Sequence, residues 1–223
     1  MFLLLNLLVV VVLFGAISPA VIFGLAGRWD LWNVWAYAGI SVISLAFQTL
    51  VIYRQSPDLL KARMMESGGR VRWTAHHAFV VLSILQWSIA GLDQRFHWSD
   101  SIPSAGLVAG LVIVAIAWGL TTWSVWVNRF FSPAVRIQAD RGQRVISTGP
   151  YAIVRHPGYA TILLCMVASA VALNSLLSII PAVIYMAVTV RQTMIEDRML
   201  RDELAGYADY AAKVRYRLIP GIW

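Results

Sequence analysis

The residues with the clearest capacity for chemistry lie in the last third of the chain, around one histidine. His156 stands between Arg155 and Pro157, immediately before an apolar run. Proline is well placed as the first residue of a helix, because its missing N–H would have no partner there. Arg155 and His156 would then lie beside unpaired N–H groups at a positive helix end, which favours a carboxylate or another anion. The alternative is that His156 only caps the helix while Arg155 reaches lipid phosphate.

A second candidate group is the acidic pair Glu196 and Asp197, which follows the last apolar run. Two acids this close together repel each other and the anionic lipids of a bilayer surface, so they need a cation. Arg191, five residues before Glu196, is one source of it, and a cationic ligand is another. The alternative is a solvated helix face with ion pairs one turn apart.

The other candidate residues carry weaker signals. Tyr207 and Tyr210 lie one turn apart, where packing is the usual role. His76 and His77 are adjacent, so their side chains point to different sides of a helix and do not share a metal. The single Cys165 excludes an intrachain disulfide and a multi-cysteine metal site. We therefore predict no metal site, and no phosphate-binding loop or zinc-protease motif is present.

The composition is that of a membrane protein. The chain is 59% hydrophobic and 13% charged, with a mean hydropathy of +0.69, whereas soluble domains are about 45–50% apolar and about 25% charged. Helices are the expected spanning form, because the bilayer core offers no water to backbone polar groups. Six apolar stretches occur, at roughly 3–25, 31–53, 76–92, 105–127, 159–173 and 176–190. We predict an all-α, polytopic membrane helix bundle of about six apolar helices, with the last two forming a short hairpin.

The basic residues predict the orientation of this bundle. The net charge is +7, and sixteen of the 18 Lys and Arg lie in 54–74, in 128–158 or after the last apolar stretch. The positive-inside rule then places both termini and the candidate residues in the cytoplasm. Orientation and attraction to anionic membrane lipid account for this surplus. Nucleic acid is not an expected partner, because no basic stripe lies on a soluble domain. The first stretch lacks a basic leader and is expected to be a retained helix.

Two connecting segments and the tail complete the predicted organisation. Ser56 before Pro57 predicts a short surface helix over 57–66 within the cytosolic loop 54–74. The long segment 128–158 is too apolar for disorder and is expected to lie against the membrane. After Val190, apolar residues recur at spacings of three and four, which predicts a C-terminal cytosolic amphipathic helix. Its apolar face comprises Met194, Ile195, Met199, Leu200, Leu204, Tyr207, Ala208 and Ala211.

Taken in order, the C-terminal motifs resemble those of the isoprenylcysteine carboxyl methyltransferase family and its wider membrane relatives, which include phospholipid methyltransferases. The resemblance covers about 145–223, while the first 140 residues match only in hydropathy. The chain departs from the family in having Asp197 where relatives have a second Glu, and Ala160 and Thr161 where relatives commonly have Gly. The motifs are Gly149-Pro150-Tyr151, Arg155-His156-Pro157-Gly158-Tyr159, Glu196-Asp197 with Leu200, Tyr207-Ala208-Asp209-Tyr210 and Leu218-Ile219-Pro220.

The resemblance implies a methyltransferase that uses S-adenosyl-L-methionine. One integrated domain would comprise a membrane-helix region, 1–140, and a C-terminal cofactor-binding and catalytic region, 141–223. Arg191 would orient the acceptor carboxylate, and Glu196 would take part in both catalysis and cofactor binding. The residues implied in cofactor binding are Gly149, Tyr151, Arg155, His156, Pro157, Tyr159, Glu196, Asp197, Tyr207, Tyr210, Leu218 and Pro220.

The expected reaction is methyl transfer to the carboxylate of a lipophilic or prenylated acceptor. A carboxylate is already ionised at neutral pH and needs no general base, whereas an amine acceptor would need one. Methylation of a phospholipid amine or a small thiol is the nearest alternative, and an NADPH-dependent membrane reductase is another. A non-catalytic carrier is disfavoured, because no ionisable residue lies in the middle of an apolar stretch to mark a transport path.

Overall fold

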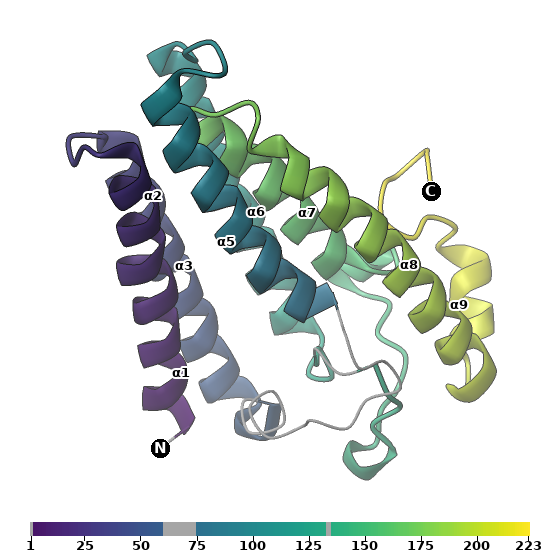
Figure 1. Cartoon of the computed structure of the whole chain (residues 1–223). Helices are drawn as coiled ribbons and strands as arrows, with labels where there is room; N and C mark the ends of the chain where they lie inside the picture. The colour runs from purple at the N-terminus through teal and green to yellow at the C-terminus, as the bar shows by residue number, and fades with distance from the viewer. Residues whose placement is uncertain (1, 60–74, 133–134) are drawn as a thin grey trace.

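The molecule is a bundle of long helices, with short turns between helices at one end (Figure 1). The computed structural model describes residues 2–59, 75–132 and 135–223, and no strand occurs in these ranges. The expected all-α bundle is confirmed. The helices are α1 (Phe2–Val10), the π-helical η1 (Val11–Ile17), α2 (Ser18–Ala26), α3 (Trp32–Gln55), α5 (Ala75–Phe96), α6 (Ser104–Val127), α7 (Pro157–Ala172), α8 (Ile179–Glu203) and α9 (Tyr207–Lys213), with two 3-10 turns, η2 (Ala139–Arg141) and η3 (Gly149–Ala152).

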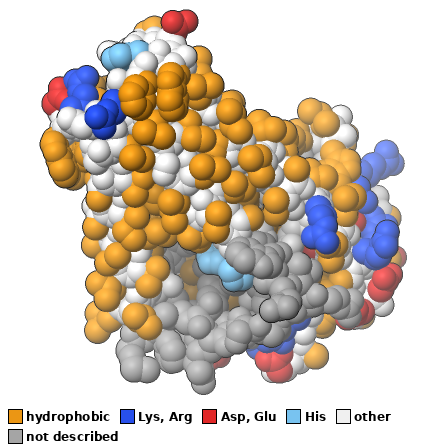
Figure 2. Space-filling model, viewed as in Figure 1, with side chains coloured by type: hydrophobic (Ala, Val, Ile, Leu, Met, Phe, Trp, Pro, Cys, Tyr) orange, Lys and Arg blue, Asp and Glu red, His pale blue; other side chains and the backbone are white. Residues whose placement is uncertain are grey.

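Five of these helices are long and apolar enough to cross a membrane. They are Leu3–Ala26, Trp32–Gln55, Ala75–Phe96, Ser104–Val127 and Ile179–Glu203. At a rise of about 1.5 Å per residue, helices of this length span the roughly 30 Å hydrocarbon core. The apolar helix α7 is shorter, and Figure 2 shows large hydrophobic side chains covering much of the visible bundle surface. The chain therefore has the build of an integral membrane protein.

The first apolar stretch is one helix with a wide middle segment. Between α1 and α2, η1 winds as a π-helix, the geometry that accommodates extra backbone in a helix and recurs at functional sites. Phe14 in this segment is buried, and the Ser18 hydroxyl donates a 2.6 Å hydrogen bond to the Phe14 carbonyl. The Phe14 ring meets Trp87 of α5 edge-on, with the ring centres 5.5 Å apart. This contact ties the first helix to the bundle core.

Close backbone approach fixes two pairs of helices in the bundle, one of which includes α7. A Cβ placed on Gly110 of α6 would lie 2.7 Å from the backbone nitrogen of Ala172 in α7. In the same way, a Cβ on Gly91 of α5 would lie 2.7 Å from the carbonyl oxygen of Ile22. Small residues allow membrane helices to pack this tightly, and dense packing makes the helix positions well defined.

The last apolar helix extends further than its hydropathy indicates. The expected stretch ends at 190, but α8 continues without a break from Ile179 to Glu203. Apolar residues such as Met199 and Leu200 keep one face buried beyond the point where charged residues begin. The expected amphipathic tail helix is therefore divided, with its first part in α8. Gly206, at φ +80°, immediately precedes the separate α9.

The expected surface helix over 57–66 is described only in part. Pro57, Asp58 and Leu59 are helical, and Leu59 is buried against Ile52 and Val125. The remainder, 60–66, lies outside the described residues.

The segments that bring the candidate site together lie toward one end of the bundle. Figure 1 shows the N terminus, the end of α3, the start of α5 and the segment after α6 at this end. The start of α7 and the lower part of α8 return to it, and α9 packs beside α8 (Figure 1). The opposite end holds the turns at 27–31, 97–103 and 173–178.

Candidate active site

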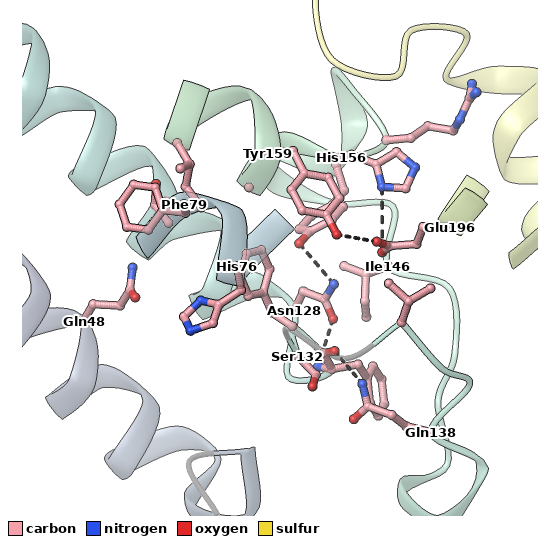
Figure 3. A pocket seen from close by; sticks show the side chains of 18 of the residues that line it. Gln48, His76, Phe79, Asn128, Ser132, Gln138, Ile146, His156, Tyr159 and Glu196 are labelled. Carbon is pink, nitrogen blue, oxygen red and sulfur yellow. Dashed lines mark hydrogen bonds and ion pairs between the residues drawn. The ribbon is translucent and has the colours of Figure 1, made fainter. Parts of the chain in front are cut away.

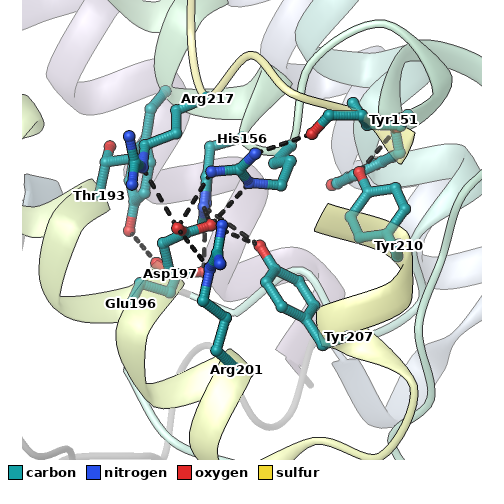
Figure 4. Close-up of polar contacts among 12 residues, drawn as sticks. Tyr151, His156, Thr193, Glu196, Asp197, Arg201, Tyr207, Tyr210 and Arg217 are labelled. Carbon is teal, nitrogen blue, oxygen red and sulfur yellow. Dashed lines mark hydrogen bonds and ion pairs between the residues drawn. The ribbon is translucent and has the colours of Figure 1, made fainter. Parts of the chain in front are cut away.

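The centre of the polar network is the carboxylate of Asp197, on α8 (Figure 4). Arg155, just before α7, approaches it with two nitrogens, Nε at 2.7 Å from Oδ1 and Nη2 at 3.1 Å from Oδ2. Both side chains are almost fully buried, 3% exposed for Asp197 and 2% for Arg155. Arg201 and Arg217 add their Nε atoms at 3.3 and 3.2 Å from Oδ2. A buried carboxylate is tolerated when it is paired and hydrogen-bonded in this way.

Arg155 also holds the C-terminal tail. Its Nη1 donates to the carbonyl oxygens of Val214 and Arg215, at 2.7 and 2.8 Å. The backbone N–H groups of Arg155 and His156 donate to the carbonyls of Tyr216 and Arg217, each at 2.9 Å. The guanidinium is thus occupied by Asp197 and the tail. Arg155 also lines the cavity, and its expected contact with a bound anion stays a prediction.

Glu196 faces a different side of α8 from its neighbour Asp197, because successive helical residues are rotated by about 100°. The Tyr159 hydroxyl donates a 2.7 Å hydrogen bond to Oε2 of Glu196. His156 lies between the two acids, with Nδ1 3.8 Å from Oε1 of Glu196 and Nε2 3.5 Å from Oδ1 of Asp197. The imidazole also stacks on the Tyr159 ring, with centroids 6.0 Å apart. Of the two acids, Glu196 therefore faces the cavity and Asp197 holds the C-terminal tail through Arg155.

Two tyrosines of α9 close the network (Figure 4). The Tyr207 hydroxyl donates to Oδ1 of Asp197 at 3.0 Å, and the Tyr210 hydroxyl donates to the carbonyl of Tyr151 at 2.7 Å. Burial, followed by the charge of Asp197, raises the pKa of Tyr207 well above its usual value. Burial likewise raises the pKa of Tyr210. Both hydroxyls therefore stay protonated at neutral pH and remain hydrogen-bond donors.

A cavity of about 450 Å³ opens beside this network (Figure 3). Its polar wall includes His156, Tyr159 and Glu196, together with Tyr207 and Asn128. The volume lies within the usual range for small-molecule sites. Aliphatic residues of the segment between α6 and α7 and of α8 line one part of the cavity. Side chains of α1, η1, α3 and α5 line another part. Asp197 does not line the cavity. Among the lining residues that the structure describes, Glu196 is the one acid.

The segment after α6 forms part of the cavity wall through its own hydrogen bonds. Asn128 donates to the Tyr151 hydroxyl at 3.1 Å, and the buried Gln138 side chain donates to the Phe130 carbonyl at 2.7 Å. Arg141 hydrogen-bonds the Gln138 side chain and the Arg129 carbonyl. These bonds hold the segment together, and Tyr210 of α9 joins it through the Tyr151 carbonyl, while its expected position against the membrane stays a prediction.

The remaining predicted site residues have distinct positions. Tyr151 lines the cavity, while Gly149 adopts φ +58° in η3 and a Cβ there would lie 2.9 Å from Val127. Pro157 is buried as the first residue of α7, as its position before an apolar run predicts. Leu218 is buried and Pro220 is exposed. The structure brings the polar residues together and leaves Pro220 at the surface.

Arg191 lies apart from this group. Its side chain is exposed on α8 and does not line the cavity. Arg144 does line the cavity, and within residues 2–59, 75–132 and 135–223 it has no acidic partner. Sequence reasoning missed Arg144, since it was one of many basic residues in a long segment. Only the fold of that segment distinguishes it.

Replacing Asp197 should test its anchoring role. We expect Asp197→Asn to lower the free energy of unfolding by about 3–5 kcal/mol, because it leaves Arg155 buried without its counter-charge. The measurement is thermal or denaturant unfolding of the purified protein in detergent. Asp202→Asn, at an exposed site on the same helix, should change stability by less than about 0.5 kcal/mol. Equal stability of the two variants would contradict the anchoring role.

Comparison with known proteins gives one family match. Residues 105–205 match the model of the phospholipid methyltransferase family. This range begins in α6 and ends just before α9, so it contains Arg155, His156, Glu196 and Asp197 but not the first three membrane helices. No match is found among curated proteins. Over residues 105–205 the chain is thus similar to the phospholipid methyltransferases, and its expected likeness to membrane methyltransferases is confirmed.

Proposed function

We propose that the protein transfers a methyl group from S-adenosyl-L-methionine to a lipophilic acceptor inside the membrane. The observation that carries this proposal is the placement of Glu196, an acid that faces a cavity with one polar wall and one largely apolar wall. The family match to phospholipid methyltransferases supports the same reaction class.

The polar part of the cavity fits this methyl donor. The donor carries an ammonium and a sulfonium, and Glu196 and the faces of Tyr159 and Tyr207 suit such cations. Its carboxylate suits the N-terminus of α7 beside His156. The donor supplies an electrophilic methyl group when it is bound.

The nucleoside of the donor suits a separate, apolar part of the cavity. A cluster between the loop and the lower part of α8 includes Val135, Val145, Met199 and Leu200, all of which line the cavity. Aliphatic side chains of this kind accommodate a flat heterocycle. The buried Gln138 beside them offers polar contacts at the edge of such a ring.

The protein's own contribution is positioning. In-line displacement needs the acceptor atom and the methyl group aligned at roughly 3–3.5 Å, which supplies much of the acceleration. Asp197 serves this indirectly, because it fixes Arg155, the tail and Tyr207. His156 is then held between its two acidic neighbours.

The first candidate acceptor is a lipophilic carboxylate. It needs no general base, and the apolar walls from α1, η1, α3 and α5 suit its tail. Arg191 was expected to orient this carboxylate, but its side chain is exposed and does not line the cavity. We assign the role to Arg144, which lines the cavity without an acidic partner among the described residues.

A phospholipid amine is the second candidate, and the family match favours it. In that case Glu196 would also accept the proton that the amine releases. Both acceptors reach the site from the bilayer, which explains why a small transferase is built largely of membrane helices.

The orientation follows from the basic residues. The segments 54–74 and 128–158 and the region after α8 carry most of the Lys and Arg. Under the positive-inside rule they lie in the cytoplasm, together with both termini and the active site. The region 1–140 would then mainly shape the acceptor path, and 141–223 would hold the donor.

Donor binding should depend on the two polar groups of the cavity wall. We expect Glu196→Gln and His156→Ala each to raise the Kd for S-adenosyl-L-methionine by roughly 10- to 100-fold, the effect of losing a charge-assisted hydrogen bond. Calorimetry on the detergent-solubilised protein measures it. Glu203→Gln, at an exposed position on the same helix, should bind as the unmodified protein does. Unchanged affinity in both cavity variants would remove those roles.

Variants of Arg144 and Arg191 should differ in their KM for the acceptor. We expect Arg144→Ala to raise the KM for a carboxylate acceptor by about tenfold while the donor Kd stays unchanged. Arg191→Ala should leave both constants as they are, since its side chain lies outside the cavity lining. A reversed result, with Arg191→Ala alone raising the KM, would restore the role expected from sequence.

The proposed reaction itself is tested by incubation with methyl-labelled donor and total membrane extract. We expect label in base-labile esters for a carboxylate acceptor, and in lipid headgroups for an amine. Label in volatile sulfides would identify a thiol acceptor. Absence of any label from the purified, folded protein, together with protection by NADPH against unfolding, would identify the reductase alternative instead.

A further inference from the structure

A second group of polar side chains lies in a part of the cavity wall away from Glu196. Asn6 of α1 and Gln48 and Thr49 of α3 line the cavity together with Leu13 and Leu45. Figure 3 shows Gln48 extending from its helix toward the cavity, with Phe79 and His76 between it and Glu196. Carboxamides are costly to bury in an apolar helix bundle unless their hydrogen bonds are satisfied.

The hydrogen bonds of Gln48 leave its oxygen free. Its side chain is 7% exposed, and Nε2 donates to the Thr122 hydroxyl at 3.4 Å. The Thr122 hydroxyl donates its one hydrogen bond to the Trp118 carbonyl, at 2.9 Å, so it can only accept a hydrogen bond from Gln48. This fixes the orientation of the carboxamide. In the part of the chain that the structure describes, Oε1 of Gln48 has no donor.

Asn6 likewise keeps one half of its carboxamide available. The Thr49 hydroxyl shares its one proton between Oδ1 of Asn6 and the Leu45 carbonyl, each 2.8 Å away, so the oxygen of the Asn6 carboxamide is the half that faces Thr49. The amide nitrogen of Asn6 has no partner among the described residues. The two helices therefore offer a free acceptor and a free donor to the same cavity.

We propose that Asn6 and Gln48 form a subsite that selects acceptors bearing an uncharged hydrogen-bonding group, such as a hydroxyl, along their lipophilic part. A hydroxyl can donate to Oε1 of Gln48 and accept from Nδ2 of Asn6. A charged group does not suit the subsite, because its side chains carry no charge. The proposal rests on the proposed function, in that this part of the cavity holds the methyl acceptor.

The alternative is a purely structural role, in which Gln48 only links α3 to α6 through its hydrogen bond to Thr122. The chain offers a matched control for it, since Thr122 carries the same hydrogen bond but does not line the cavity. Gln48→Leu removes both the interhelical bond and the cavity group, whereas Thr122→Val removes the bond alone. The two variants therefore separate ligand selection from packing.

The experiment measures binding to the full-length protein in detergent by calorimetry. The probes are stearic acid and a panel of its monohydroxy derivatives, with the hydroxyl moved along the chain. We expect one hydroxyl position to bind about tenfold more tightly than stearic acid, as one to two hydrogen bonds allow. Gln48→Leu should abolish this preference and Thr122→Val should retain it. Asn6→Leu should also abolish it, and it serves where Gln48→Leu fails to fold.

Two results would overturn the subsite. One is an unmodified protein that binds every probe equally, or none of them. The other is loss of the preference in Thr122→Val to the same extent as in Gln48→Leu. The measurement requires no methyl transfer, so its failure leaves the proposed reaction standing. Absence of labelled product from membrane extract would reject the reaction independently.

Discussion

The buried ion pair between Arg155 and Asp197 is the interaction on which the rest of the site depends. It joins the start of α7 to α8, and the same guanidinium holds the tail through two carbonyl oxygens. Removing two charges from water is costly, and the pair is tolerated because nearly every donor and acceptor is satisfied. Its main effect is therefore specificity of position rather than stability in itself. Three segments distant in sequence meet at one carboxylate, and the cavity takes its shape from their meeting.

This arrangement separates two acids that the sequence presents as one pair. Glu196 is left with a tyrosine hydroxyl and a cavity, while Asp197 is enclosed by three arginines and Tyr207. A cationic ligand finds an acid available only at the first of them. The division leaves one acid of a strongly basic chain facing the cavity, where the proposed methyl donor would place its positive charges.

Hydropathy predicts most of the bundle, because a span of about 20 apolar residues has few other stable forms in a bilayer. It fails at the lower part of α8, where Arg191 and the acids lower the local hydropathy although Met199 and Leu200 continue the buried face. The helical period predicts that Glu196 and Asp197 diverge, but only the packing of α7 and the tail decides which one meets the cavity. Arg144 and Gln48 carry no motif, and only the fold shows that both line the cavity.

The π-helical segment in the first helix has a consequence for evolution along this chain. A wide turn is equivalent to one inserted residue, and each residue turns a helix by about 100°. Because the wide turn absorbs that residue, deleting one here would rebuild an ordinary helix with α1 and α2 still facing the same way. Asn6 would keep its face toward the cavity, whereas a deletion in the regular α3 would turn Gln48 by about 100° relative to the residues beyond it. The first helix can therefore change its length by one residue and keep its contacts.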